Sequence, residues 1–409
     1  MATAILYAII AFILVEFVFN KVIDMLNLST WDKPIPNELK ELYEQEKFEK
    51  AKAYAKANAK LGTISGSISL VITLAMLWFY GFASIDTFAQ QVSGNAIVQA
   101  LVFFAFISVG SFVIGLPFSI YSIFVIEQKY GFNKMTVGLF IVDTIKNILL
   151  GVIIGGAVLA LLTWLYTLLG AYFWLAGWVV VSVVTIFFAM FYTSFFLPIF
   201  NKLSPLEDGE LRQAIEAYAK KVDFSLTNIF VIDGSKRSAK ANAFFSGLGG
   251  KKSIVLYDTL IKDLSTEEIT AVLAHEVGHY RKKHVQQSMV ISVLQFGVMF
   301  SLFGWLSSFP LMAQVLGAKA NNFHLSLITF SLLFSPVGTV TGILMHIFSR
   351  KNEYEADNYA KETFSAAPLI NALKKLTVNH LGNPQPHPAY IFMHYSHPTL
   401  LQRMRAMLQ

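Results

Sequence analysis

Long apolar runs alternate with polar connections along the whole chain, and this pattern predicts helices that cross a membrane. A membrane-spanning helix needs about 20 mostly apolar residues. Seven runs come close to this length: residues 3–19, 61–82, 97–126, 148–169, 173–196, 288–306 and 323–348. No basic residue precedes the first run, so we interpret it as a retained span rather than as a cleaved signal peptide. Pro117 in the third run and Pro336 in the seventh predict helix kinks.

The composition supports a protein with several membrane spans. Of the 409 residues, 55% are hydrophobic and only 14% are charged, and the mean hydropathy is +0.54. Soluble domains carry about 25% charged residues. The chain has no cysteine, which excludes disulfide bonds, thiolate metal sites and cysteine nucleophiles.

Basic residues are distributed unevenly among the polar connections. They are frequent in residues 20–60, 127–147, 201–284 and 349–409, absent from 83–96 and nearly absent from 310–322. Basic connections of membrane proteins face the cytoplasm, and seven spans with the N-terminus outside place every basic segment on that side. The net charge of +6 is therefore interpreted as a sign of membrane topology. The expected partner is the lipid bilayer, and no nucleic acid is expected.

Two polar segments are long enough to build a domain outside the bilayer. The first is predicted to hold a helix at 207–222 and strands at 228–232 and 253–257, with a glycine-rich turn at 246–252. Such strands predict a small sheet whose exposed edge accepts an extended peptide. The last 61 residues are predicted to be mostly helical. The expected fold class is a mainly α membrane protein with seven transmembrane helices and a small cytoplasmic α+β domain.

These patterns divide the chain into four regions. Residues 1–200 form an N-terminal membrane region with five spans, and residues 285–348 add two more. Residues 201–284 form the first part of the predicted catalytic domain, and residues 349–409 form its second part.

A metal-binding motif lies in the first part of that domain. His275 and His279 are separated by one turn of a predicted helix, so both imidazoles lie on one face and can bind one Zn²⁺. Glu276 follows the first histidine and can act as the general base of a metalloprotease. Ser265 and Glu268 have the spacing of a capping box at the start of this helix. A chance occurrence of the motif is the alternative, and a third ligand would argue against it.

The third ligand is predicted in the acidic sequence that follows the seventh apolar run. Glu353 and Asp357 share one helix face, whereas Glu355 points away from it. Glu353 can bind the metal, and Asp357 can accept the second N–H of a ligating histidine. A solvated acidic patch is the alternative interpretation.

Five further polar residues have open roles. His284 lies five residues after His279, on another helix face, and is not predicted to bind the metal. His394, His397 and Arg403 form a second polar cluster, in which a histidine can stabilise an oxyanion and Arg403 can bind a substrate carboxylate or orient a neighbour. Glu16 lies in the first span, where a carboxylate is a functional candidate unless it sits at the membrane interface.

Five segments together resemble the type I CAAX prenyl endopeptidases, integral-membrane zinc metalloproteases of the gluzincin type. The resemblance covers nearly the whole chain. It rests on the sequences HEVGH, SRKNEYEADNYA, AKANAFFSGLGGKKSIVLYDTLI, EQKYGFNKMTVGLF and HYSHPTLLQRM.

The resemblance implies a set of site residues and a fold. By it, His275, His279 and Glu353 bind one Zn²⁺ per chain, Glu276 is the catalytic base, and Asp357 and His397 assist catalysis. By it, too, Asn242, Ala243 and Phe244 form a segment beside the substrate. The implied fold is seven helices that enclose a chamber, with the zinc domain at one end.

The expected activity is a membrane zinc endopeptidase that hydrolyses peptide bonds near the C-terminus of prenylated CAAX-type or related membrane-associated protein substrates. Its expected location is the endoplasmic reticulum membrane of a eukaryote or the inner membrane of a bacterium, with the site facing the cytoplasm. Two alternatives are a quality-control membrane protease of the heat-shock type and a non-catalytic scaffold that retains a zinc site. The second is disfavoured because a structural site needs no Glu276.

Overall fold

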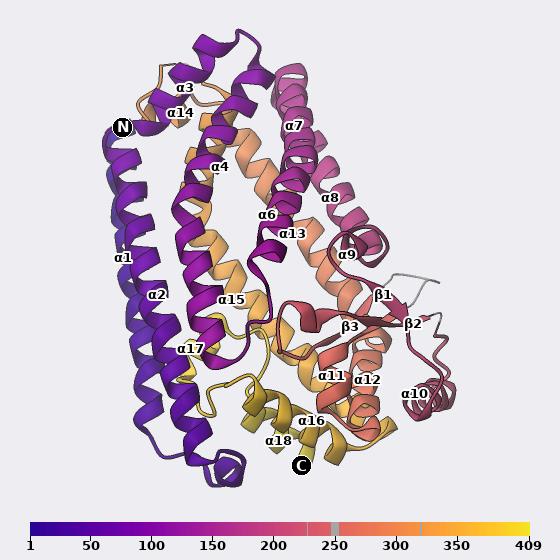
Figure 1. Cartoon of the computed structure of the whole chain (residues 1–409). Helices are drawn as coiled ribbons and strands as arrows, with labels where there is room; N and C mark the ends of the chain where they lie inside the picture. The colour runs from indigo at the N-terminus through magenta and orange to yellow at the C-terminus, as the bar shows by residue number, and fades with distance from the viewer. Residues whose placement is uncertain (227, 247–252, 320) are drawn as a thin grey trace.

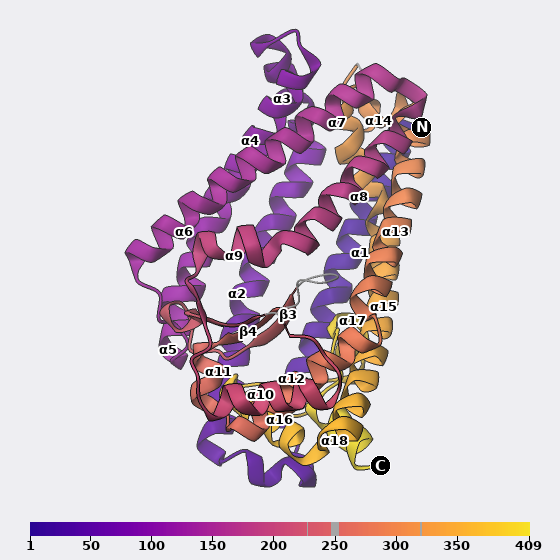
Figure 2. The same ribbon diagram turned by 90° about the vertical axis from the view of Figure 1, so that its right-hand side faces the viewer.

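The fold is an elongated bundle of long helices with a small sheet and short helices at one end (Figures 1 and 2). The computed structural model describes residues 1–226, 228–246, 253–319 and 321–409. The N-terminus lies at the end of the bundle opposite the sheet, and the C-terminus lies beside the helices that accompany the sheet (Figure 1). The predicted turn at 246–252 lies outside the described residues except for Ser246.

In the described residues, eight long or medium helices build the bundle: α1 (Ala2–Ser29), α2 (Gln45–Trp78), α4 (Ala96–Tyr121), α6 (Val137–Leu150), α7 (Gly156–Leu169), α8 (Phe173–Phe191), α13 (His284–Ser307) and α15 (Phe323–Thr363). Shorter α-helices at its ends are α3 (Gly81–Val92), α5 (Gln128–Tyr130), α9 (Leu197–Phe200) and α14 (Leu311–Val315). Short 3₁₀ helices occur at η1 (Thr30–Asp32), η2 (Asn37–Leu42), η5 (Gly170–Tyr172) and η7 (Gly234–Lys236). π-helical turns occur at η3 (Ser122–Glu127), η4 (Gly151–Gly155) and η6 (Tyr192–Phe196).

Six helical stretches in the described part of the chain are long and apolar enough to cross a membrane. One of them, Val137–Phe200, contains two of the seven apolar runs predicted from the sequence. The chain reverses within it at Gly170, whose φ of +50° suits a residue without a side chain. Helices α7 and α8 therefore lie side by side (Figure 2). If α7 and α8 each cross the membrane, the chain crosses it seven times, and this number stays a prediction.

The helices of the bundle expose many large apolar side chains. Phe106 is 56% exposed, Val109 62% and Val152 66%. An apolar surface this extensive is stable against lipid tails and unstable in water. The helical bundle is therefore suited to a bilayer along most of its length.

Glu16 lies in the middle of α1 and faces α15. Ser335 Oγ and Thr339 Oγ1 donate hydrogen bonds to its carboxylate at 3.3 and 3.1 Å. Pro336 lies inside α15 between these two residues, and Pro117 lies inside α4 just before the π-helical turn η3. The carboxylate therefore satisfies its hydrogen bonds between two membrane helices.

The domain at the end of the bundle combines a four-stranded sheet with helices. Its strands are β1 (Leu203–Pro205), β2 (Asn228–Ile232), β3 (Ala243–Ser246) and β4 (Ser253–Tyr257), in the order β1-β2-β4-β3. The bounds of β2 and β4 confirm both predicted strands, which pair in parallel. The other two strands pair antiparallel at the edges. Within the part of the chain that the structure describes, β3 pairs with a strand on one side only, so its other edge is open to a further strand.

The helices of this domain come from both polar segments. Helices α10 (Glu210–Lys221), α11 (Asp258–Asp263) and α12 (Thr266–Arg281) precede the last two long helices, and α16 (Ala366–Asn379), α17 (Pro388–His394) and α18 (Leu400–Leu408) follow them. One apolar core joins these helices except α17, and it includes Ile215, Leu256, Leu273, Ala274 and Leu369. Burial of such side chains, about 25 cal/mol for each Å² of apolar surface, unites the two segments into one unit.

Candidate active site

Helix α12 carries the HEVGH motif, and its start is held by local hydrogen bonds. Glu268 donates its backbone N–H to Ser265 Oγ, and the Glu268 carboxylate accepts the N–H of Ser265 at 2.8 Å. This arrangement confirms the predicted capping box. Lys375 Nζ lies 2.8 Å from the same carboxylate and ties the start of α12 to α16. The helix is thus fixed where the motif begins.

Three side chains converge between α12 and α15. His275 Nε2 lies 3.1 Å from His279 Nε2, and Glu353 oxygens lie 3.5 and 3.3 Å from these two nitrogens. His275 and Glu353 are buried, and His279 is half-buried. These are the three residues that the sequence predicts as metal ligands.

The cluster fits a small divalent cation. Ligand atoms of a tetrahedral Zn²⁺, with bonds of about 2.0–2.1 Å, lie about 3.3 Å apart, close to the distances observed here. Glu353 Oε2 is buried and accepts no hydrogen bond, so a cation would satisfy it. Burial lowers the pKa of His275, but the nearby carboxylates of Asp357 and Glu353 outweigh burial and raise the pKa to about 9. The pocket therefore favours positive charge.

Gly278 lets the two helices approach closely enough to form this cluster. A Cβ atom at Gly278 would lie 3.0 Å from Ala356 Cα and 3.1 Å from the Ala356 carbonyl oxygen. Atoms of the main chain cannot move aside as a flexible side chain can. The glycine between the two histidines therefore brings α12 to the distance at which Glu353 meets them.

A buried network orients the first histidine. Asp357 Oδ1 lies 2.9 Å from His275 Nδ1, in the position to accept its proton, which leaves Nε2 free for a metal. Arg403 Nε donates to Asp357 Oδ2 at 2.8 Å, and Arg403 Nη1 lies 3.4 Å from Glu353 Oε2. Hydrogen bonds that fix a ligating histidine in this way raise metal affinity. Of the two roles considered for Arg403, the geometry favours orienting its neighbours.

His284 orients the second histidine, a contact that the sequence interpretation missed. Lys283 has a φ of +60° and ends the helical path after α12, so α13 starts at His284 in a new direction. The His284 Nδ1 atom lies 2.9 Å from His279 Nδ1, and its Nε2 atom lies 3.3 Å from Glu355 Oε2. His279 can thus donate from Nδ1 and present Nε2 to a metal. The prediction that His284 lies on another face holds only for a continuous helix, and the break at Lys283 brings the His284 ring back to His279.

A cavity of about 360 Å³ opens beside the cluster. Its lining residues include Glu276 and His397, with Ala241, Asn242, Ala243 and His380 on the side of the sheet. His397 is exposed, and its Nε2 atom lies 3.3 Å from Glu353 Oε1. The cavity thus brings the carboxylate of Glu276 and the imidazole of His397 beside the three clustered side chains.

Two candidates from the sequence lie elsewhere. Phe244 packs against Tyr192 and Tyr257 and is not among the residues that line the cavity. His394 packs against Tyr390 on α17 and is also not among them. Of the cluster near the C-terminus, the structure brings His397 and Arg403 to the site.

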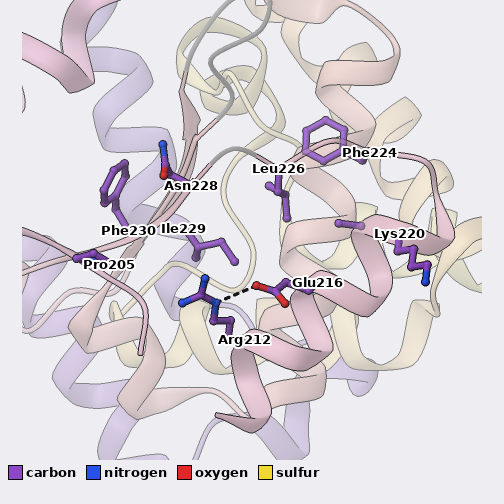
Figure 3. A pocket seen from close by; sticks show the side chains of 10 residues that line it. Pro205, Arg212, Glu216, Lys220, Phe224, Leu226, Asn228, Ile229 and Phe230 are labelled. Carbon is purple, nitrogen blue, oxygen red and sulfur yellow. Dashed lines mark hydrogen bonds and ion pairs between the residues drawn. The ribbon is translucent and has the colours of Figure 1, made fainter. Parts of the chain in front are cut away.

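A second hollow, of about 320 Å³, lies between α10 and strands β1 and β2 (Figure 3). Its charged side chains at the centre are Arg212 and Glu216, which pair with each other at 2.8 Å (Figure 3). Its lining includes no histidine and no residue of the metal cluster. The hollow therefore has no chemistry that competes with the site between α12 and α15.

Comparisons with known proteins agree with this geometry along the whole chain. Residues 24–202 match a family described as CAAX prenyl protease N-terminal, five membrane helices, and residues 205–409 match peptidase family M48. CAAX prenyl protease 1 of Saccharomyces cerevisiae is 36% identical over 399 residues, which cover 91% of this chain and 88% of that protein. The CAAX prenyl protease 1 homolog of Homo sapiens is 32% identical, with 91% and 88% covered. The crystal structure of S. mikatae Ste24p has a TM-score of 0.94 at 35% identity and covers 98% of this chain and 99% of that one.

Proposed function

This chain belongs to the CAAX prenyl proteases of peptidase family M48 and is a membrane-embedded metalloendopeptidase. We propose that its metal is zinc, and we assign roles to the residues around it. His275, His279 and Glu353 hold one Zn²⁺. The observation that carries this proposal is the convergence of their ligand atoms within 4.8 Å of one another, beside a cavity that Glu276 lines. Two nitrogens and one carboxylate are a donor set that suits zinc.

The residues around the metal have separate roles in peptide hydrolysis. When bound, zinc polarises the scissile carbonyl and acidifies water. Glu276 takes the proton from the attacking water, the oxygen bonds to the carbonyl carbon, and Glu276 returns the proton to the amine nitrogen as the C–N bond breaks. His397 donates a hydrogen bond to the oxyanion on the former carbonyl oxygen. Asp357, Arg403 and His284 hold the ligands in position.

The substrate binds as an extended chain along the edge strand. Strand β3 pairs with β4 on one side, and Ala243 at its start lines the cavity. An added peptide strand gains main-chain hydrogen bonds at such an edge. Asn242 and Ala243 therefore contact the substrate main chain near the scissile bond.

The site lies on the cytoplasmic side of a bundle of seven spans that enclose a chamber, and the substrate carries a C-terminal Cys-aliphatic-aliphatic-X motif with a prenyl group. Two features support this orientation. The catalytic domain stands at the end of the bundle opposite the N-terminus (Figure 1), and the polar segments rich in Lys and Arg connect at that end. The substrate class follows from the relatives named CAAX prenyl protease 1.

Cleavage of a farnesylated Cys-aliphatic-aliphatic-X peptide by the purified full-length protein tests the proposal. An unprenylated peptide of the same sequence reports whether the lipid is recognised, and a Glu276→Ala variant with an intact metal cluster is the control. We expect cleavage that a chelator abolishes, that Zn²⁺ restores and that the variant lacks. Failure of the zinc-loaded protein to cleave either peptide would reject the substrate assignment.

A further inference from the structure

We propose that His380 is a positioning residue for peptide cleavage: its imidazole fixes the segment 240–243 along the catalytic cavity by accepting the backbone N–H of Ala241. The donor nitrogen lies 3.0 Å from His380 Nε2. This inference rests on the proposed function, in which the same segment contacts the substrate.

The contact is made at the entrance to the edge strand. Ala241, Asn242, Ala243 and His380 all line the cavity that holds Glu276. The carbonyl of Asn242 accepts the N–H of Tyr257 at 3.1 Å and so continues the pairing with β4. Ala241 lies one residue earlier, and its N–H is directed to His380 at the end of α16 instead. The catalytic domain therefore holds the residues just before the strand through His380, at Ala241, and through Thr259 Oγ1 of α11, which donates to the Lys240 carbonyl at 3.1 Å.

Lys240 anchors the other side of the segment to the membrane helices. Its Nζ atom donates to Tyr54 Oη at 3.0 Å and lies 3.2 Å from Glu127 Oε2. The same ammonium lies 4.4 Å from the centre of the Phe132 ring, a favourable cation–π distance. The segment is thus held by α2 and η3 through Lys240 and by α16 through His380.

The loop that follows η3 pairs with the residues before Lys240. Ala239 donates its N–H to the Phe132 carbonyl at 2.9 Å, and Lys134 donates to the Arg237 carbonyl at 3.1 Å. Arg237 Nε in turn donates to Asp143 Oδ2 of α6 at 2.7 Å. These contacts attach residues 237–240 to the membrane region, and His380 ties the next residue, Ala241, to α16 beside the cavity.

The surroundings of His380 keep its imidazole able to accept the hydrogen bond from Ala241. An imidazole nitrogen accepts a hydrogen bond only where it carries no proton. Burial lowers the pKa of His380, Lys240 lowers it further, and Asp263 opposes them. The neutral form is thereby retained at neutral pH with Nε2 unprotonated.

Removal of the His380 imidazole should weaken substrate binding and leave the rate of the chemical step unchanged. A segment that is ordered before the peptide arrives spares the entropy of ordering it on binding. Once the peptide is bound, Glu276, His397 and the metal are where they were. The KM value should therefore rise while kcat stays the same, a pattern that general unfolding or metal loss would not produce.

The test compares four purified, zinc-loaded, full-length proteins: wild type, His380→Leu, His380→Gln and His394→Leu. Leucine removes the acceptor, glutamine supplies an amide oxygen, and His394 is a histidine outside the cavity that serves as the matched control. The readouts are KM and kcat for the peptide above, zinc per chain, and hydrogen exchange of the Ala241 amide. A hydrogen bond of this kind contributes about a 3- to 10-fold effect.

We expect His380→Leu to raise KM about 3- to 10-fold, with kcat within about twofold, one zinc per chain and faster exchange at Ala241. Glutamine should restore both KM and exchange, and His394→Leu should match wild type. Unchanged exchange in His380→Leu would overturn the inference even if no peptide is cleaved. A fall in kcat at constant KM, or zinc loss, would also overturn it. Absence of zinc-dependent cleavage by wild type would instead reject the proposed function.

Discussion

His284 Nδ1 lies 2.9 Å from Nδ1 of His279, so a residue outside the predicted metal-binding motif orients one of its histidines. The other nitrogen of His284 reaches Glu355, 3.3 Å away. Proton donation therefore runs from His279 to His284 and from His284 to the Glu355 carboxylate. These two contacts leave the Nε2 lone pair of His279 free, on the side of the ring that faces Glu353.

Replacement of His284 by leucine should weaken metal binding. Loss of a partner of this kind costs about 10- to 100-fold in metal affinity, because the ligating ring is no longer held in one orientation. Competition with a chromophoric chelator measures the effect on purified protein. His394→Leu is the control and should lose metal at the same chelator concentration as wild type. Equal retention by both variants would show that His284 does not orient His279.

Gly278→Ala should separate α12 from α15. The new methyl group would meet the main chain of Ala356 at 3.0 and 3.1 Å, and overpacking of this kind costs about 1–3 kcal/mol. The higher helix propensity of alanine offsets about 1 kcal/mol of that cost. We expect a lower Tm and weaker zinc binding.

Gly338→Ala is the matched control for this change. Gly338 lies in α15 itself, and a methyl group there would meet nothing within 4 Å. This variant should unfold at or above the wild-type temperature, because it gains helix propensity without a collision. A Gly278→Ala protein as stable as Gly338→Ala would contradict the close packing described for the two helices.

His397→Ala should slow turnover without removing the metal. Loss of one oxyanion donor lowers kcat by about 10² to 10³, whereas the three ligands stay in place. Steady-state kinetics and zinc analysis on the same sample test both parts. Loss of zinc in proportion to activity would mean that His397 is a ligand rather than an oxyanion donor.

Glu268 predicts a pH-dependent contribution to stability. Burial raises its pKa, but the ion pair with Lys375 and the N–H of Ser265 outweigh burial and hold the pKa below its ordinary value. A lowered folded-state pKa means a contribution that is complete above the unfolded carboxyl pKa of about 4.3 and is lost as the pH falls through the folded-state value. Glu268→Gln keeps a side chain able to cap the helix and removes the charge.

The Tm of Glu268→Gln should therefore lie below that of wild type at pH 7, and the two should converge toward pH 3.5. The expected difference corresponds to about 0.5–1 kcal/mol, because Lys375 is half exposed and solvent screens the pair. Thermal unfolding in detergent across this pH range measures it. A Tm difference that is constant with pH would rule out the charge as its source.

The sequence by itself determined the parts of this protein that depend on local spacing. One helical turn between His275 and His279 places both rings on one face, whatever the rest of the chain does. The capping box at Ser265 and the bounds of β2 and β4 are local in the same sense. The apolar runs likewise follow from the thickness of a bilayer. The residues of the metal cluster could therefore be predicted, and so could the membrane-bound fold class.

The tertiary structure decided which distant residues support that cluster. Arg403 reaches Asp357 because α18 packs against α15. The His284 ring contacts His279 because the helix breaks at Lys283. His380 meets Ala241 only where α16 ends beside the sheet. Spacing along the chain carries no signal for such contacts, because they depend on how helices pack and where a single residue takes a positive φ. These distant residues meet because the two polar segments pack around one apolar core.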